Sequence, residues 1–147
     1  MDYRTLVVLH AVPTLCLTGL IWFVQRVHYA LYPAVGAEAF VAYERAHCRR
    51  IAPLVLPLMV AELGLAAAVW WYAPDAVANG WALAGMTLLA VVWGSTFLYQ
   101  VPCHQQLEQR ADPQALAHLL ATNWLRTIAW TLRAVVAVRL LLLPAAA

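Results

Sequence analysis

The feature that most constrains this chain is a set of four long apolar stretches separated by short polar segments. Each stretch approaches or exceeds the ~20 residues that a helix needs to cross the hydrocarbon core of a bilayer. Of the 147 residues, 65% are hydrophobic and only 11% are charged, whereas a soluble domain is about half apolar and a quarter charged. We therefore predict an all-α integral membrane protein that folds as a four-helix bundle.

The apolar stretches predict one membrane domain over residues 1–147. The four spans are expected at about 6–32, 51–72, 81–100 and 116–143. Residues at about 37–50 carry only a weak apolar stripe, which predicts an interfacial helix that leads into the second span. Pro102 lies just before His104 and is expected to interrupt the third helix there.

The distribution of arginine predicts the orientation in the membrane. The first and third connections and their flanks hold Arg26, Arg45, Arg49, Arg50 and Arg110, whereas the second connection holds only Asp75. By the positive-inside rule, the first and third connections are cytoplasmic and both termini lie outside. The net charge of +2 contains no block of like charge, so no nucleic-acid partner is expected.

Four histidines are predicted to share one layer of the bundle. Counted inward from the outer ends of the spans, His28, His47, His104 and His118 fall within ~5 Å of a common depth near the cytoplasmic end. Glu44 lies one turn further in, and Glu44 and His47 share a helix face because they are three residues apart. Glu-x-x-His is also the spacing that di-metal helical bundles use to bind an ion.

These residues predict a metal or catalytic centre. The expected ligands are His28, Glu44, His47 and His104, and such a nitrogen and oxygen set suits iron, zinc or copper. His28 and His104 are also candidate catalytic residues, because an imidazole exchanges protons near neutral pH.

Alternatives to this centre stay open. Cys48 adjoins His47 and Cys103 adjoins His104, which allows a zinc or copper(I) site that contains a thiolate. A hydrogen-bonded polar plug without metal, or solvated residues at the interface, would use the same side chains. A b-type haem would need His28 opposite His104 and is less favoured, because both lie near the interface.

The fourth span has a polar face. Asn123, Arg126, Trp130 and Arg133 recur at the spacing of one side of a helix, and ionisable residues inside a membrane generally face the protein interior. We predict that Asn123, Arg126 and Trp130 bind substrate; the alternative for Arg126 is that it extends to lipid phosphate. Glu62 lies at about the same depth as Arg133, so these two are expected to form a structural ion pair.

Two segments carry a family resemblance: VPCHQQL at residues 101–107 and NWLRTIAW at residues 123–130. With its span count and length, the chain resembles the small four-span membrane proteins of the anthrone-oxygenase-like domain family, and its first half is similar to a bacterial branch. The resemblance implies oxygenation of an aromatic, polyketide-like phenol without a dedicated cofactor. Of the site residues, only Asn123 and Arg126 match the family motif by position.

We therefore expect a small oxidoreductase of the bacterial inner membrane, with a polar pocket at the cytoplasmic end of the bundle. Its expected partners are the lipid bilayer and a hydrophobic small molecule, and a homo-oligomer is compatible with the sequence. The alternative is a small transport or accessory subunit, in which Glu62 and Arg133 line a path and the histidines form a gate. A polar track across the bilayer favours transport, and a pocket closed at one end favours chemistry.

Overall fold

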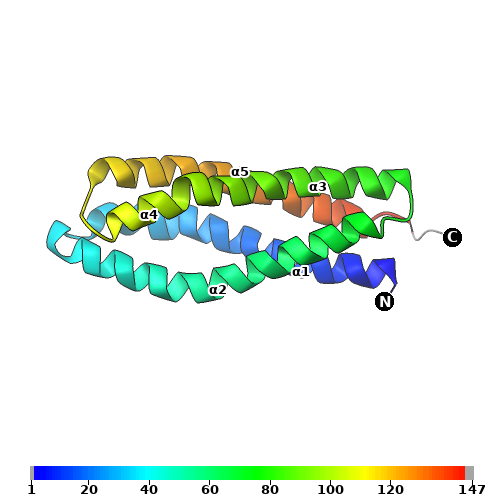
Figure 1. Cartoon of the computed structure of the whole chain (residues 1–147), viewed down its shortest axis with the longest axis horizontal. Helices are drawn as coiled ribbons and strands as arrows, with labels where there is room; N and C mark the ends of the chain where they lie inside the picture. The colour runs from blue at the N-terminus through cyan, green and yellow to red at the C-terminus, as the bar shows by residue number, and fades with distance from the viewer. Residues whose placement is uncertain (1, 145–147) are drawn as a thin grey trace.

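The computed structural model describes residues 2–144 as a bundle of four long helical rods (Figure 1). The elements are α1 (Tyr3–Phe23), the π-helix η1 (Val24–His28), the 3-10 helix η2 (Tyr29–Ala34), α2 (Ala37–Trp71), α3 (Ala76–Ser95), the π-helix η3 (Thr96–Gln100), α4 (Val101–Leu107) and α5 (Pro113–Leu141). Since no strand occurs within residues 2–144, the prediction of an all-α fold is confirmed.

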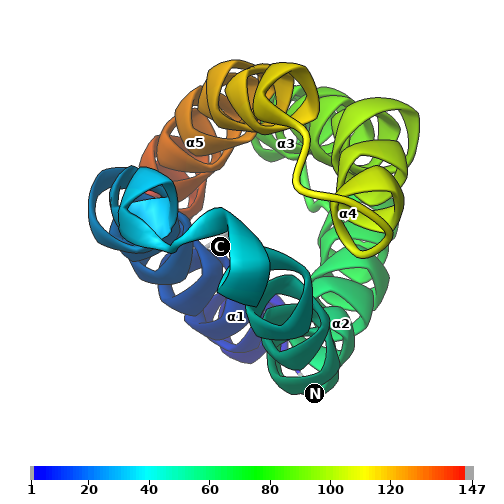
Figure 2. The same cartoon turned by 90° about the vertical axis from the view of Figure 1, so that its left-hand side faces the viewer.

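The rods are antiparallel neighbours around a common axis. α1 packs against α2 and α5, and α3 packs against the same two helices from the opposite side (Figure 2). The start of α1, the end of α5 and the α2–α3 connection lie at one end of the bundle (Figure 1), which we call the terminal end. η2, α4 and the α4–α5 connection lie at the other end, which we call the α4 end.

Aspartates begin three of the four rods. Asp2, Asp75 and Asp112 each precede a helix, and each carboxylate accepts a hydrogen bond from a backbone N–H of the first turn. Such caps satisfy N–H groups that have no partner inside the helix. At the start of α5, the backbone N–H of Ala115 is the main reason that the pKa of the Asp112 carboxyl lies below its usual value.

Three rods are long and apolar enough to cross a membrane, namely Tyr3–Ala34, Ala37–Trp71 and Ala76–Leu107. The fourth expected span corresponds to α5, which has 29 residues. α5 is more polar than the others because it carries Arg126 and Arg133, and both of these arginines are buried inside the bundle.

Residues 37–50 form a helix that leads directly into the second expected span. α2 runs without a break from Ala37 to Trp71, and Pro53 lies inside it. Phe40 and Glu44 are buried against the bundle, so tertiary packing holds the first turns of α2. A proline removes one backbone hydrogen bond. Here that loss does not end the helix, because residues of α2 before and after Pro53 are buried against the bundle.

Two π-helical turns, η1 and η3, lie toward the α4 end. Pro102 is the second residue of α4, the helix that follows η3, and it has no N–H to donate to the preceding turn. The widened turn over Thr96–Gln100 accommodates that loss, so the rod continues where a break was expected. Such π turns are frequent at functional sites, and these two carry or adjoin the histidines discussed next.

Candidate functional site

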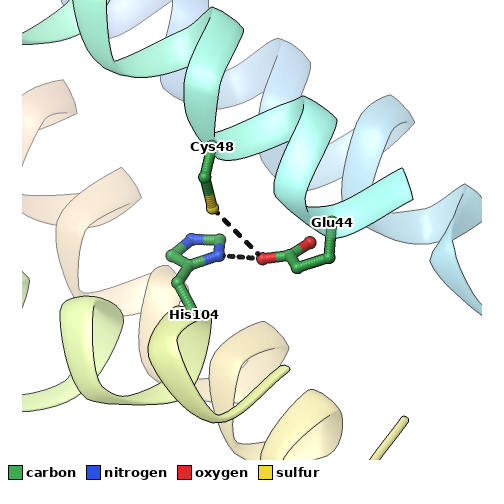
Figure 3. A group of neighbouring side chains, drawn as sticks. All are labelled: Glu44, Cys48 and His104. Carbon is green, nitrogen blue, oxygen red and sulfur yellow. Dashed lines mark hydrogen bonds and ion pairs between the residues drawn. The ribbon is translucent and has the colours of Figure 1, made fainter. Parts of the chain in front are cut away.

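The centre of the candidate site is a contact between α2 and α4. Glu44 is fully buried, and its Oε1 forms a short hydrogen bond with Nδ1 of His104. Cys48, one turn further along α2, donates its thiol to the same oxygen at 3.5 Å. Figure 3 shows all three side chains pointing toward one another. Their candidate ligand atoms lie within 4.8 Å of one another.

Local structure explains this convergence. Glu44 and Cys48 are four residues apart on an α-helix, so they lie on the same face. His104 lies in the first turns of α4, directly after the π turn η3. An extra residue in a helical turn rotates everything that follows it about the axis, and in this protein the imidazole after η3 faces α2.

The hydrogen bonds determine the tautomer of His104. Its Nε2 lies 3.0 Å from the hydroxyl of Tyr29, and its Nδ1 contacts Glu44. An ionised carboxylate only accepts hydrogen bonds, so Nδ1 carries the proton that it shares with Glu44. When the ring is neutral, Nε2 is the acceptor and the hydroxyl of Tyr29 donates to it. The imidazole is held on both sides, as a ring that transfers protons or binds a metal needs to be.

The other two predicted ligands extend the cluster. Nε2 of His28 lies 2.8 Å from Nδ1 of His47, and the ring centroids of His47 and His104 are 5.7 Å apart. The structure therefore brings all four predicted residues into one cluster, with Glu44 and His104 in direct contact. His47 is adjacent to this pair, and His28 lies behind His47 as its hydrogen-bond partner.

Some residues of the cluster were not among the predicted ligands. Cys48 was only an alternative, although its spacing from Glu44 could have identified it. Tyr29 was missed, because it follows the π turn η1 and α-helical counting gives the wrong face for it.

His118 is a correction to the predicted layer of histidines. It is exposed on α5 and packs against Tyr99, with ring centroids 5.8 Å apart. Counting residues gives the depth of a side chain in the bundle, but it does not give the face of the helix on which the side chain lies.

Two polar atoms of the cluster are buried without a hydrogen-bond partner among residues 2–144, namely Oε2 of Glu44 and the hydroxyl of Tyr32. Tyr32 packs edge-on against the rings of His28 and His47 at the border of the cluster. An unpaired buried group of this kind costs about 1–3 kcal/mol. An ion or other ligand bound at the cluster is one of the few reasons that such groups persist.

A cavity of about 360 Å³ adjoins the cluster. Its polar end is lined by Tyr29, His47, Cys48 and His104. Most of the remaining wall is apolar and comes from α1, α2, α3 and η3; it includes Ile21, Ile51, Val55, Met59, Trp93 and Phe97. Two lining residues, Leu56 on α2 and Phe97 on η3, are more than half exposed, so the cavity opens sideways between these two elements.

The predicted substrate-binding residues lie at different distances from this cavity. Arg126 and Trp130 line it, and the guanidinium carbon of Arg126 lies 5.0 Å from the centre of the indole ring. Asn123 is fully buried behind them. Its Oδ1 accepts a hydrogen bond from Nη1 of Arg126 at 3.3 Å, and its Nδ2 donates to Gln25 at 2.7 Å. Asn123 thus orients Arg126 and does not line the cavity.

A second buried carboxylate, Glu62, lies further toward the terminal end. Nε of Arg133 donates to its Oε1 at 2.8 Å, which is the expected ion pair. Thr14 donates to the same oxygen at 2.9 Å, and Nε1 of Trp130 donates to Oε2 at 3.1 Å. Arg133 also donates to the backbone carbonyl of Gly85. This network joins α1, α2, α3 and α5.

No protein-family model matches the chain, and no curated protein or solved structure is significantly similar to it. The resemblance to the anthrone-oxygenase-like family stays a prediction.

Proposed function

We propose that this protein is a small integral membrane oxidoreductase of the bacterial inner membrane, which acts on a hydrophobic molecule admitted from the bilayer. The observation that carries the proposal is the cavity, which has ligand-type side chains at one end and a sideways opening between apolar helix faces. A molecule dissolved in lipid can reach the Glu44–Cys48–His104 cluster through this opening without passing through water.

The proposed membrane topology has four spans, with α5 as the fourth. Large apolar side chains are exposed along the rods, among them Leu54, Trp71 and Leu98, and a lipid environment would cover them. Arg49 and Arg110 belong to an excess of arginine at the α4 end. By the positive-inside rule this end faces the cytoplasm, and both termini face outward.

The proposed metal centre uses Glu44, Cys48 and His104 as ligands. An oxygen, a sulfur and a nitrogen donor suit zinc, copper or iron, and of these copper and iron support redox chemistry. Oε2 of Glu44 has no other partner and is available to an ion. His47 is close enough to complete a fourth position after a side-chain rotation, and His28 would then orient it.

Acid–base chemistry is the alternative to metal binding at His104, because a histidine that holds a metal cannot also become an imidazolium. In the proposed role, Nε2 of His104 takes a proton from a substrate hydroxyl, and the Glu44 carboxylate stabilises the imidazolium that forms. Tyr29 keeps the ring in place before the substrate binds. The electrons pass to an oxidant, and the family resemblance implies that the oxidant is dioxygen.

Elemental analysis of the purified protein tests this proposal. We expect close to one iron, copper or zinc ion per chain, and loss of most of that metal in Cys48→Ser and in His104→Ala. His118→Ala is the matched control, because His118 is an exposed histidine at a similar depth that does not reach the cluster. A wild-type protein without metal, or a metal content that is equal in all variants, would contradict the proposal.

The transport alternative has one supporting observation. Trp130 donates to Glu62 and stacks on Arg126, so it links the two polar regions along the bundle axis. We favour the enzymatic role because Glu62 and Arg133 are enclosed, at 0% and 1% exposure. Proton uptake by proteoliposomes that stops in Glu62→Gln would instead support transport.

A further inference from the structure

Arg126 is a buried cation without an anionic partner. Its side chain is only 8% exposed, and within residues 2–144 no carboxylate lies at ion-pair distance from it. Its Nε has no hydrogen-bond partner. Because arginine stays protonated in proteins, this group keeps a full positive charge at the wall of the cavity.

The partners that Arg126 does have are weak for a charge at this depth. Nη1 donates to a neutral amide oxygen at 3.3 Å, and the guanidinium stacks on Trp130. Arg133 lies two turns further along the same face of α5 and has a carboxylate oxygen at 2.8 Å. An isolated charge inside a bilayer is costly. The contrast indicates that the negative charge for Arg126 comes from a ligand.

We infer that the cavity binds a hydrophobic monocarboxylate, with its carboxylate on the guanidinium of Arg126 and its apolar body extending past Ile51 toward the opening at Leu56 and Phe97. The inference rests on the proposed function and names the class of molecule that enters the cavity. The contact between the carboxylate and Arg126 holds the apolar body of the ligand inside the cavity. The wall of this cavity includes His47 and Cys48.

Charge and shape favour a carboxylate over other head groups. A planar carboxylate matches the fork of a guanidinium with two parallel hydrogen bonds, and its single negative charge neutralises the single cation. A neutral carbonyl or alcohol would leave the charge of Arg126 unbalanced. Phosphate would introduce a second negative charge into a wall that is otherwise mostly apolar.

The size of the cavity limits the apolar body. A volume of about 360 Å³ corresponds to roughly twelve water molecules at ~30 Å³ each. A chain of medium length, or one or two rings, fits this space, and a longer chain would extend through the opening into lipid.

Tryptophan quenching by a brominated fatty acid tests the inference. Trp93 and Trp130 line the cavity, so 11-bromoundecanoate bound there should quench their fluorescence. The protein is placed in phosphatidylcholine nanodiscs at neutral pH and titrated with this acid or with 11-bromo-1-undecanol, which has the same chain and a neutral head. We expect saturable quenching by the acid, with a Kd at least tenfold lower than for the alcohol.

Variants of the arginine provide the second comparison. Arg126→Gln should abolish the preference for the acid, whereas Arg126→Lys should keep part of it because the charge remains. Arg139→Gln is the matched control, because Arg139 is also on α5 but lies near the terminal end, beside Trp81. Equal affinity of the wild-type protein for acid and alcohol would overturn the inference, and so would unchanged acid binding in a folded Arg126→Gln protein.

The experiment separates this inference from the proposed metal centre. Cys48→Ser should lose metal and still bind the acid. Acid binding by a protein that holds no metal would support the carboxylate site and contradict the metal centre. Metal binding without any preference for the acid would overturn the carboxylate site alone.

Discussion

Glu62 and Glu44 lie on the same helix, α2, and both are 0% exposed, yet their surroundings differ. The two oxygens of Glu62 accept hydrogen bonds from Arg133, Thr14 and Trp130. Glu44 has one imidazole and one weak thiol donor, and its Oε2 has no partner. A buried carboxylate whose donors are complete stabilises the fold. We propose that one left incomplete beside a cavity is a site for a ligand.

The two buried arginines of α5 differ in the same way. Arg133 is neutralised by Glu62 and also donates to a backbone carbonyl of α3. Arg126 has an amide and an indole ring as partners, and it borders the cavity. The hydrogen bonds are therefore complete at the Glu62–Arg133 pair and incomplete at Glu44 and Arg126. This difference is the reason that we expect stability from the first pair and propose binding at the second.

The largest expected effect is on stability at Glu62. Glu62→Gln should lower the free energy of unfolding by about 3–5 kcal/mol, because it leaves Arg133 buried without its counter-ion. Glu44→Gln should lower it by about 1 kcal/mol or less, because relief of a poorly satisfied buried charge offsets the lost hydrogen bond. Unfolding of the detergent-solubilised protein measures both values. Equal losses would remove the distinction between the two carboxylates.

The ion pair between Glu62 and Arg133 should also be detectable as an energetic coupling between the two residues. A double-mutant cycle with Glu62→Gln and Arg133→Gln should give a coupling energy of about 2 kcal/mol, since residues in one buried network are not additive. The double variant should therefore be more stable than the sum of the single losses predicts. Strict additivity would show that the ion pair does not hold the bundle together.

Removal of Arg126 and removal of Arg133 should lower the free energy of unfolding by different amounts. Arg126→Gln should cost about 1 kcal/mol, because no carboxylate loses its partner and only the contacts to Asn123 and Trp130 change. Arg133→Gln should cost several times more. Thermal melting of the two variants in the same detergent measures this order, and the reverse order would count against a ligand-binding role for Arg126.

The smallest expected effect is a pH dependence at the start of α5. The pKa of Asp112 is lowered in the folded protein by the backbone N–H of Ala115 and by Arg110. Its contribution to stability is complete above the ordinary value of 3.8 and is lost as the pH falls through the lower folded pKa. Asp112→Asn should therefore reduce the difference in melting temperature between pH 5 and pH 3. An unchanged difference would contradict this role.

Much of the helical frame could be predicted from the sequence, since long apolar stretches and arginine-rich connections determine the number of rods and their ends. The polar face of α5 was also predictable, because Asn123, Arg126, Trp130 and Arg133 follow one helical period and all four are buried. Glu62 and Arg133 could be matched because each is a lone charge at the same depth, and such charges need partners.

The details of the site could not be predicted in the same way. Tyr29 and His104 follow π turns, and an added residue in a turn changes the face of every later side chain. Residue counting also gives depth but not the face of a helix, so it placed His118 in the layer although this side chain faces outward. The helix over residues 37–50 and its passage into the second span were predicted, and α2 continues through both Pro53 and Pro57.

The central claim is that the incomplete cluster at the α4 end binds a transition metal through Glu44, Cys48 and His104. X-ray absorption spectroscopy of the metal in the purified protein tests it most directly, because a thiolate ligand differs in distance, at ~2.3 Å, from nitrogen and oxygen ligands at ~2.0–2.2 Å. We predict one sulfur and two or three nitrogen or oxygen ligands, with the sulfur lost in Cys48→Ser. A coordination shell without sulfur, or one that Cys48→Ser leaves unchanged, would contradict the claim.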